Sequence, residues 1–172
     1  MKTATTGLVQ SQQIMYDAPV DHSQDYRIDD AKALQTYYNT YPEECDTFAE
    51  QLEVAARFGF TSVFHATRLI SKYNLPETKT LNLNIFSIGS SVGFYTAPAE
   101  LWDSFSVEME TKSPFKTTFC IGYSNGSVAY IPYKLDYEYS YEDLYCLFDW
   151  SEITAVMMDY YTQYLNLFYE NA

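Results

Sequence analysis

Basic side chains are scarce in this chain. Its 172 residues include 10 lysines and arginines against 23 aspartates and glutamates, a formal net charge of −13. Such an excess argues against direct binding to nucleic acid or to an anionic membrane surface, because both are negatively charged. We therefore expect a partner with a basic surface. The alternative explanation is that the acidity only keeps the protein soluble.

Cysteine and long apolar runs are scarce as well. Cys45, Cys120 and Cys146 are odd in number, widely spaced and set among apolar residues, which favours free, partly buried thiols in a reducing compartment. The N-terminal sequence has no apolar run of signal-peptide length, and no segment approaches the roughly 18 apolar residues that span a membrane. We expect a cytoplasmic protein that makes no membrane contact.

The common catalytic motifs are missing. The sequence has no GxxxxGKS, GxGxxG or CxxC pattern. Its two histidines, His22 and His65, lack the HxH or HExxH spacing of zinc ligands, and we interpret both as solvated or core-edge side chains. Nothing in the spacing supports a nucleophile and base made of Cys120 and His65. These absences favour a protein that is not an enzyme.

Apolar and aromatic residues are plentiful, at 47% and 18%. This composition predicts a packed protein, and the length suits one domain. Residues 1–27 lack periodicity and are expected to form an extended arm, followed by a single domain over residues 28–172.

Helical periodicity dominates the first half of the domain. It predicts three helices, over residues 29–41, 43–58 and 61–73. Asp29 and Thr61 are the expected caps, and Gly59 is placed to end the second helix. The apolar set expected to face the core in that helix is Phe48, Leu52, Ala55 and Ala56.

Strand patterns follow. Residues 80–96 predict a hairpin that turns at Gly89, and Pro98 is expected to open a helix. Residues 115–131 predict two strands around an Asn125-Gly126 turn, and Ser151 is expected to cap the last helix. The fold class is α+β. A central antiparallel or mixed sheet (about 80–96 and 115–131) is packed by N-terminal helices (about 29–73) and a C-terminal helix (about 152–169).

Two motifs stand out in the second half, PAE at residues 98–100 and SNGSVAYIP at residues 124–132. SPF precedes the second motif, and the pair Tyr141-Glu142 follows it. Together they resemble the C-terminal portion of the zinc amidase domain of neutral, non-lysosomal ceramidase-like proteins. The resemblance implies a ceramidase-like α+β fold. It also implies that Glu100 and Tyr130 correspond to the glutamate and tyrosine that bind zinc in that family.

The resemblance implies only half of a metal site. Ala99 and Ala129 replace family glycines, and the family's histidine ligands and catalytic serine belong to an N-terminal region without a counterpart in this sequence. A catalytic zinc uses about three protein ligands. We therefore interpret Glu100 and Tyr130 as a vestigial half site and expect no cofactor. Zinc is expected only if the chain is part of an amidohydrolase.

Carboxylates and tyrosines gather toward the end of the chain. Residues 133–172 hold eight carboxylates, one lysine and nine of the 18 tyrosines. Tyrosines are favoured interface anchors, and outward carboxylates complement a basic partner. The alternative is that these tyrosines pack on the core with their hydroxyls in water. The candidate partner-binding residues are Asp136, Tyr137, Glu138, Tyr139, Tyr141, Glu142, Asp143 and Asp149.

Two functions are carried forward from the sequence. The first is a non-catalytic acidic binding protein on a truncated ceramidase-like fold. It would inhibit a basic nucleic-acid-binding protein by charge mimicry, as small phage and mobile-element inhibitors such as anti-CRISPR proteins do. A Cas9-type effector is an example of such a partner, because its channel is basic. The second function is a fragment of a zinc-dependent ceramidase-like amidohydrolase that acts on lipid amides. An inactive structural domain is a third option.

Overall fold

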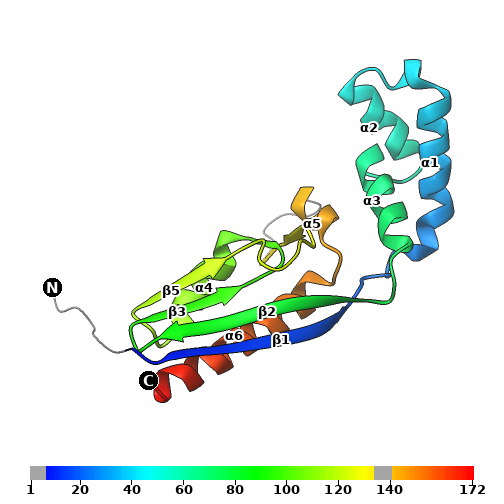
Figure 1. The fold of residues 1–172 in the computed structure, drawn as a ribbon. Coiled ribbons are helices and arrows are strands. Elements are labelled where there is room, and N and C mark those ends of the chain that lie inside the picture. The colour runs from blue at the N-terminus through cyan, green and yellow to red at the C-terminus, as the bar shows by residue number, and fades with distance from the viewer. Residues whose placement is uncertain (1–6, 134–140) are drawn as a thin grey trace. The chain divides into compact units, whose positions relative to one another are not determined.

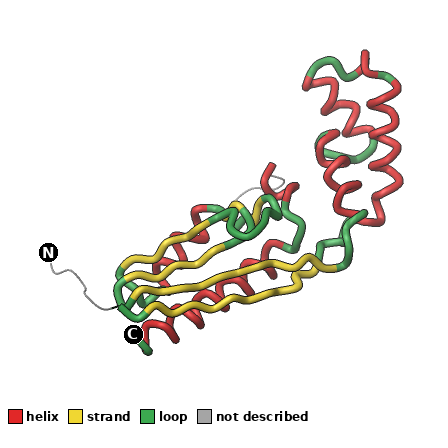
Figure 2. The backbone as a smooth tube through the Cα atoms, in the orientation of Figure 1, coloured by secondary structure: helices red, strands yellow, loops and turns green. Residues whose placement is uncertain are grey.

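The computed structural model describes residues 7–133 and 141–172. Internal contacts divide the chain into two compact units. We call Val20–Thr78 the helical unit, and Met1–Pro19 together with Lys79–Ala172 the sheet unit. Figure 2 distinguishes their helices and strands by colour. This division does not coincide with the predicted arm over residues 1–27 and domain over residues 28–172.

The helical unit packs three α-helices around a small core (Figure 1). Its elements in chain order are η1 (Asp25–Arg27), α1 (Ile28–Thr40), η2 (Pro42–Glu44), α2 (Phe48–Arg57) and α3 (Val63–Tyr73). The buried residues of its core are Ala31, Leu34, Cys45, Val54, Ala55, Phe60, Ala66 and Leu69.

Side-chain caps and one glycine set the limits of α2 and α3. The Thr47 hydroxyl accepts from the backbone N–H of Glu50, and the Glu50 carboxylate accepts from the backbone N–H of Thr47, which makes a capping box. Gly59 follows α2 with a φ of 77°, as its predicted role at the helix end requires. Ser62 caps α3, so the predicted cap at Thr61 is wrong by one residue.

Two further predictions for this unit are wrong. Helix α1 begins one residue before Asp29 and has no side-chain cap, so Asp29 lies in its first turn. On α2, Phe48, Leu52 and Ala56 are exposed, whereas Val54 and Ala55 are buried. The helical period is correct. Ala55 belongs to both the predicted and the observed apolar face of the helix. The helical periodicity alone therefore did not show which of the two faces is buried.

The sheet unit is built on a four-stranded mixed sheet (Figure 1). Its strands, in spatial order, are β1 (Val9–Pro19), β2 (Thr78–Ile88), β3 (Val92–Thr96) and β5 (Thr117–Ile121). Strands β2 and β3 form the predicted antiparallel hairpin, and β5 lies parallel to β3. Strand β1 is antiparallel to β2, because Leu8 bonds to Gly89 at one end and Asp17 to Thr80 at the other.

Strand β1 lies where the sequence predicted an arm without periodicity. Its more buried positions alternate along the strand, and two of them, Gln10 and Gln12, are polar. The Gln10 amide donates to the Phe168 carbonyl over 2.6 Å, which satisfies a polar group on this side of the strand. Because glutamine occupies positions where apolar residues are expected, the strand period was not visible in the sequence.

Helices α4 (Asp103–Lys112) and α6 (Trp150–Glu170) pack on one face of the sheet (Figure 1). The Tyr161 hydroxyl of α6 donates to the Thr96 carbonyl over 2.7 Å, inside the core. The predicted α+β class is confirmed. The predicted cap of the last helix is corrected, because Asp149 rather than Ser151 accepts the first backbone N–H groups of α6. The largest fully buried side chains of this core include Tyr95, Tyr161, Phe105, Leu81, Leu83, Ile85, Met109, Met157 and Leu165.

A second, two-stranded parallel sheet joins β4 (Glu100–Leu101) to β6 (Tyr130–Ile131). The sequence predicted a helix from Pro98, but α4 begins only at Asp103. The reason is that the preceding backbone bonds across to the segment before and within β6, with Val128 N–H donating to the Pro98 carbonyl over 2.7 Å. A short helix, α5 (Tyr141–Tyr145), follows.

Two scarcities in the sequence have structural counterparts. All three cysteines are free, with Cys45 and Cys146 buried and Cys120 partly buried, which confirms the prediction of free thiols. Among the helices in the described part of the chain, none combines the length and the apolar character needed to span a bilayer.

Candidate functional site

The β4–β6 pair brings Glu100 and Tyr130 together. They are direct partners in the parallel register, with the Glu100 N–H donating to the Ala129 carbonyl over 2.9 Å. These two residues were singled out from the sequence as a half site, and the structure places them side by side. Their metal-binding role stays a prediction.

An unusual loop supports this pair. Between β5 and β6, Tyr123, Asn125 and Ala129 have φ values of 52°, 62° and 64°. These values lie in the left-handed region, which residues other than glycine adopt uncommonly. Backbone hydrogen bonds hold the loop in place, with Tyr123 N–H donating to the Ala99 carbonyl and Ser124 N–H to the Ala97 carbonyl. Strain maintained by surrounding contacts is common at functional sites.

The loop directs Tyr123 onto Glu100. The Tyr123 hydroxyl donates to Glu100 Oε2 over 2.6 Å. This hydrogen bond to a carboxylate favours the protonated phenol and raises the pKa of Tyr123 to about 12. Glu100 is exposed, and Tyr123 is 54% exposed. The carboxylate and the phenol ring are therefore both accessible at the surface.

Tyr130 extends the group toward α5. The Glu100 charge is the largest cause that raises the pKa of Tyr130, and Glu142 contributes in the same direction. The Tyr130 and Tyr145 rings meet edge to face, with centroids 5.9 Å apart. We call Glu100, Tyr123, Tyr130, Glu142 and Tyr145 the carboxylate–tyrosine cluster.

The donors in the cluster do not match a catalytic zinc site. Zinc sites of that kind use about three protein ligands, usually with at least one imidazole. In the described residues the cluster offers two carboxylates and three phenols, and Glu100 Oε2 already accepts a hydrogen bond from the Tyr123 hydroxyl. Across residues 7–133 and 141–172, no group of three or more histidine, cysteine, aspartate or glutamate side chains is placed to hold a metal ion.

Both histidines belong to the helical unit, whereas the cluster belongs to the sheet unit. His65 is buried, with Nδ1 3.0 Å from Thr61 Oγ1, and burial lowers its pKa. His22 Nδ1 lies 2.9 Å from Asp25 Oδ2. The interpretation of His65 as a core-edge histidine is confirmed. His22 does not lie in a free polar arm as expected but bonds to η1.

The predicted partner-binding residues fall into three groups. Glu142 is partly buried and belongs to the cluster, and Asp149 is exposed and caps α6. Tyr141 and Asp143 lie in α5. The remaining predicted residues lie outside the described residues, and they are Asp136, Tyr137, Glu138 and Tyr139.

Sequence reasoning missed Tyr123 and Tyr145. A signal for Tyr123 was present, since the Asn125-Gly126 turn two residues later predicts a reversal that returns the chain toward the preceding strand. The partner of that reversal was misassigned, because β5 was expected to pair with the segment after the turn. It pairs with β3 instead. No local signal in the sequence links Tyr145 to Tyr130.

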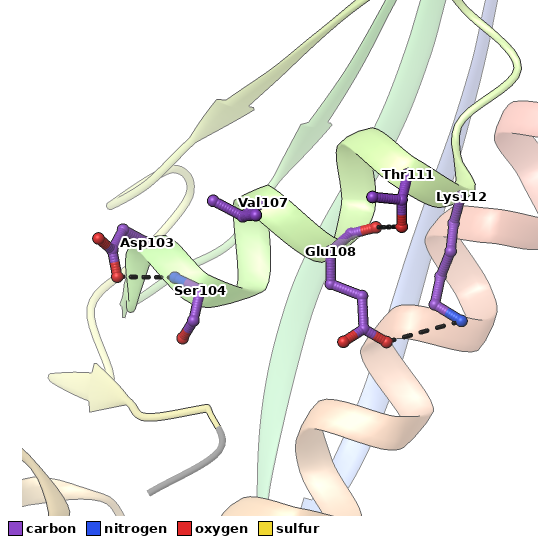
Figure 3. A pocket seen from close by; sticks show the side chains of 6 residues that line it. All are labelled: Asp103, Ser104, Val107, Glu108, Thr111 and Lys112. Atoms are coloured by element: carbon purple, nitrogen blue, oxygen red, sulfur yellow. Dashed lines mark hydrogen bonds and ion pairs between the residues drawn. The ribbon is translucent and has the colours of Figure 1, made fainter. Parts of the chain in front are cut away.

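A separate hollow of about 610 Å³ lies along α4 (Figure 3). Lys112 and Glu108 form an ion pair at 3.7 Å along α4, and the Ser104 hydroxyl donates to the Tyr133 carbonyl over 3.0 Å. Because its charged and polar groups already have partners, we assign the hollow no binding role. Its lining residues are Asp103, Ser104, Val107, Glu108, Thr111 and Lys112.

No family model, curated protein or solved structure matches this chain. The resemblance to ceramidase-like proteins rests on the motifs at residues 98–100 and 124–132 and stays a prediction.

Proposed function

We propose that the chain is a non-catalytic binding protein, on a truncated ceramidase-like fold, whose carboxylate–tyrosine cluster engages a basic protein surface. The observation that supports this most is the 2.6 Å hydrogen bond from Tyr123 to Glu100, in a cluster that also includes Tyr130. It fixes an exposed carboxylate beside the phenol groups of Tyr123 and Tyr130.

This arrangement suits arginine and lysine. A carboxylate attracts the cation, and the cation packs over the face of a neighbouring tyrosine ring in a cation–π contact. Both phenols are protonated near neutral pH, and a phenol oxygen also accepts hydrogen bonds from the N–H groups of arginine and lysine. Tyrosine loses little conformational entropy in a contact, which favours it as an anchor.

The net charge of −13 indicates the class of partner. Proteins that bind DNA or RNA expose lysine and arginine to phosphate, and an acidic protein competes for the same surface. We propose inhibition of a basic nucleic-acid-binding protein by charge mimicry, with a Cas9-type effector as one example.

A pull-down against a panel of purified nucleic-acid-binding proteins, Cas9-type effectors included, tests this function. The variant Glu100→Lys with Glu142→Lys should lose capture. The matched control is Asp159→Lys with Glu170→Lys, which makes the same change in net charge at exposed positions of α6. Equal capture by both variants would sink the cluster as the binding surface. A further variant that reverses Asp136, Glu138 and Asp143 tests the remaining predicted acidic residues.

The second candidate is a fragment of a zinc-dependent amidohydrolase. It is favoured by one observation, the direct pairing of Glu100 with Tyr130, which the resemblance requires. Elemental analysis of the purified protein and an assay of amide hydrolysis on a ceramide test it. Stoichiometric zinc with activity that disappears in Glu100→Gln would replace the binding proposal.

A further inference from the structure

The sheet has a second face, opposite α4 and α6, on which three phenylalanines form a ladder. Phe86, Phe94 and Phe119 lie on β2, β3 and β5 and are register partners across the strands. Ring centroids are 4.4 Å apart for Phe86 and Phe94 and 5.4 Å apart for Phe94 and Phe119, and both pairs are stacked. Phe119 is 50% exposed.

Apolar side chains extend this ladder along the strands. Positions with the same alternation include Ile88 and Ile121, 48% and 39% exposed, and Val9 and Met15, 67% and 61% exposed. We call this surface the open sheet face. Its outward residues are Val9, Ser11, Gln13, Met15 and Asp17 on β1, Thr80, Asn82, Asn84, Phe86 and Ile88 on β2, Val92 and Phe94 on β3, and Thr117, Phe119 and Ile121 on β5.

The open sheet face is large enough for a stable contact. Two strands of 11 residues and two of 5 residues make it up. At about 3.3 Å per residue and about 4.8 Å between strands, its projected area is about 500 Å². The accessible area of a rough surface exceeds its projection, and a standard interface buries about 800 Å² per partner. Eight of the fifteen outward residues named above are apolar, and exposed apolar patches mark interaction sites.

Charge decides what occupies this face. Among the outward residues given above, Asp17 is the one charged side chain, and it lies at the end of β1. Aromatic rings on a four-stranded sheet can stack nucleic acid bases, but such sites also need lysine or arginine for the phosphates. A basic protein would need carboxylates there. The remaining class of partner has an uncharged, partly apolar surface of its own. A second copy of the chain has such a surface in its own open sheet face.

Self-association through this face also fits the net charge. Two copies of a chain with a net charge of −13 repel each other. Contact through the open sheet face places no two carboxylates opposite each other at the centre of the interface. The charges of the two copies therefore repel each other over longer distances, at which salt screens the repulsion. We propose that two copies of the chain pack their open sheet faces together as a two-fold symmetric sandwich.

Sedimentation equilibrium of the full chain at 0.15 M and 1 M NaCl tests this proposal. We expect a dimer that strengthens with salt, because screening removes the repulsion between copies. Phe119→Asp should weaken it roughly a hundredfold, since a two-fold dimer meets the buried charge twice. Ile88→Asp is a second variant at an exposed site, in case Phe119→Asp misfolds. The control Val107→Asp alters an exposed apolar residue of α4 and should leave the dimer unchanged.

Several results would overturn the proposal. One is a wild-type monomer at about 100 μM in 1 M NaCl, since a standard interface holds at that concentration. Another is equal weakening by Val107→Asp. A third is a wild-type monomer that binds a labelled single-stranded oligonucleotide, together with loss of that binding in the variant Phe119→Asp. That result would assign the phenylalanine ladder to nucleic acid binding. The partner-binding proposal is separable, because binding to a basic protein weakens as salt rises.

Discussion

Tyr123 donates a hydrogen bond to Glu100 over 2.6 Å and thereby joins segments 23 residues apart in the chain. The contact depends on a positive φ at Tyr123 and on the early end of β4, neither of which is set by the apolar pattern. It turns an exposed carboxylate and a phenol into one fixed surface feature.

Titration of the phenols tests the contact itself. The hydrogen bond raises the pKa of Tyr123 from 10.0 to about 12, so its stabilisation is fully present below pH 10 and is lost as pH rises through about 12. Absorbance near 295 nm should show a set of late-ionising tyrosines, and Tyr123→Phe should remove one phenol from that set. In Glu100→Gln the same phenol should ionise earlier. An unchanged titration in both variants would mean that the bond does not form in solution.

Loss of the buried Tyr161 hydroxyl should destabilise the sheet unit. Tyr161→Phe leaves the Thr96 carbonyl without this donor, which should lower the free energy of unfolding by about 1–2 kcal/mol. Urea denaturation measures the change. Tyr169→Phe is the control, because Tyr169 is 42% exposed on the same helix and should have little effect. Similar losses in both variants would contradict the core role of the hydroxyl.

Gly93 of β3 lies in close contact with core side chains. A Cβ at this position would lie 2.7 Å from Phe115 Cδ2 and 2.8 Å from Leu165 Cδ2. Gly93→Ala should therefore cost about 1–3 kcal/mol of stability through overpacking. Gly7→Ala, whose Cβ would meet its nearest atom at 3.4 Å, is the control. A neutral Gly93→Ala would indicate looser packing than the structure shows.

Asp149 has a structural role that competes with its predicted role in binding. It accepts from the backbone N–H groups of Ser151 and Glu152, so Asp149→Ala should cost about 1 kcal/mol in a denaturation experiment. Asp149→Asn keeps a capping side chain and removes the charge. If Asp149→Asn preserves stability and weakens partner binding, Asp149 both caps α6 and contributes its charge to binding. If Ala leaves stability unchanged, the cap is unimportant.

Elements with a regular period could be predicted from the sequence. The β2–β3 hairpin, the three N-terminal helices and the last helix follow from apolar spacing, Gly59 and Gly89. Strand β1 could not, because Gln10 and Gln12 interrupt the alternation. The sheet register of β5 also could not, since pairing with β3 is a long-range choice that no local signal sets.

The candidate site was predictable only in part. Glu100 and Tyr130 were predicted from the motif resemblance. Their pairing in the structure depends on two short parallel strands of two residues each, which sequence periodicity does not predict. Tyr123 was missed because its role depends on a backbone reversal with three residues at positive φ. Asn125 favours a positive φ by itself, whereas Tyr123 and Ala129 are held at positive φ by backbone hydrogen bonds to distant residues.

Competition for a basic protein surface tests the central claim most directly. Labelled DNA is bound to the effector captured in the pull-down and is then titrated with this chain, with fluorescence anisotropy measured at 0.05 M and 0.5 M NaCl. We expect displacement of the DNA that weakens as salt rises and is lost in Glu100→Lys with Glu142→Lys, but not in Asp159→Lys with Glu170→Lys. Displacement that is indifferent to salt and to the cluster reversal, or no displacement of DNA, would contradict it.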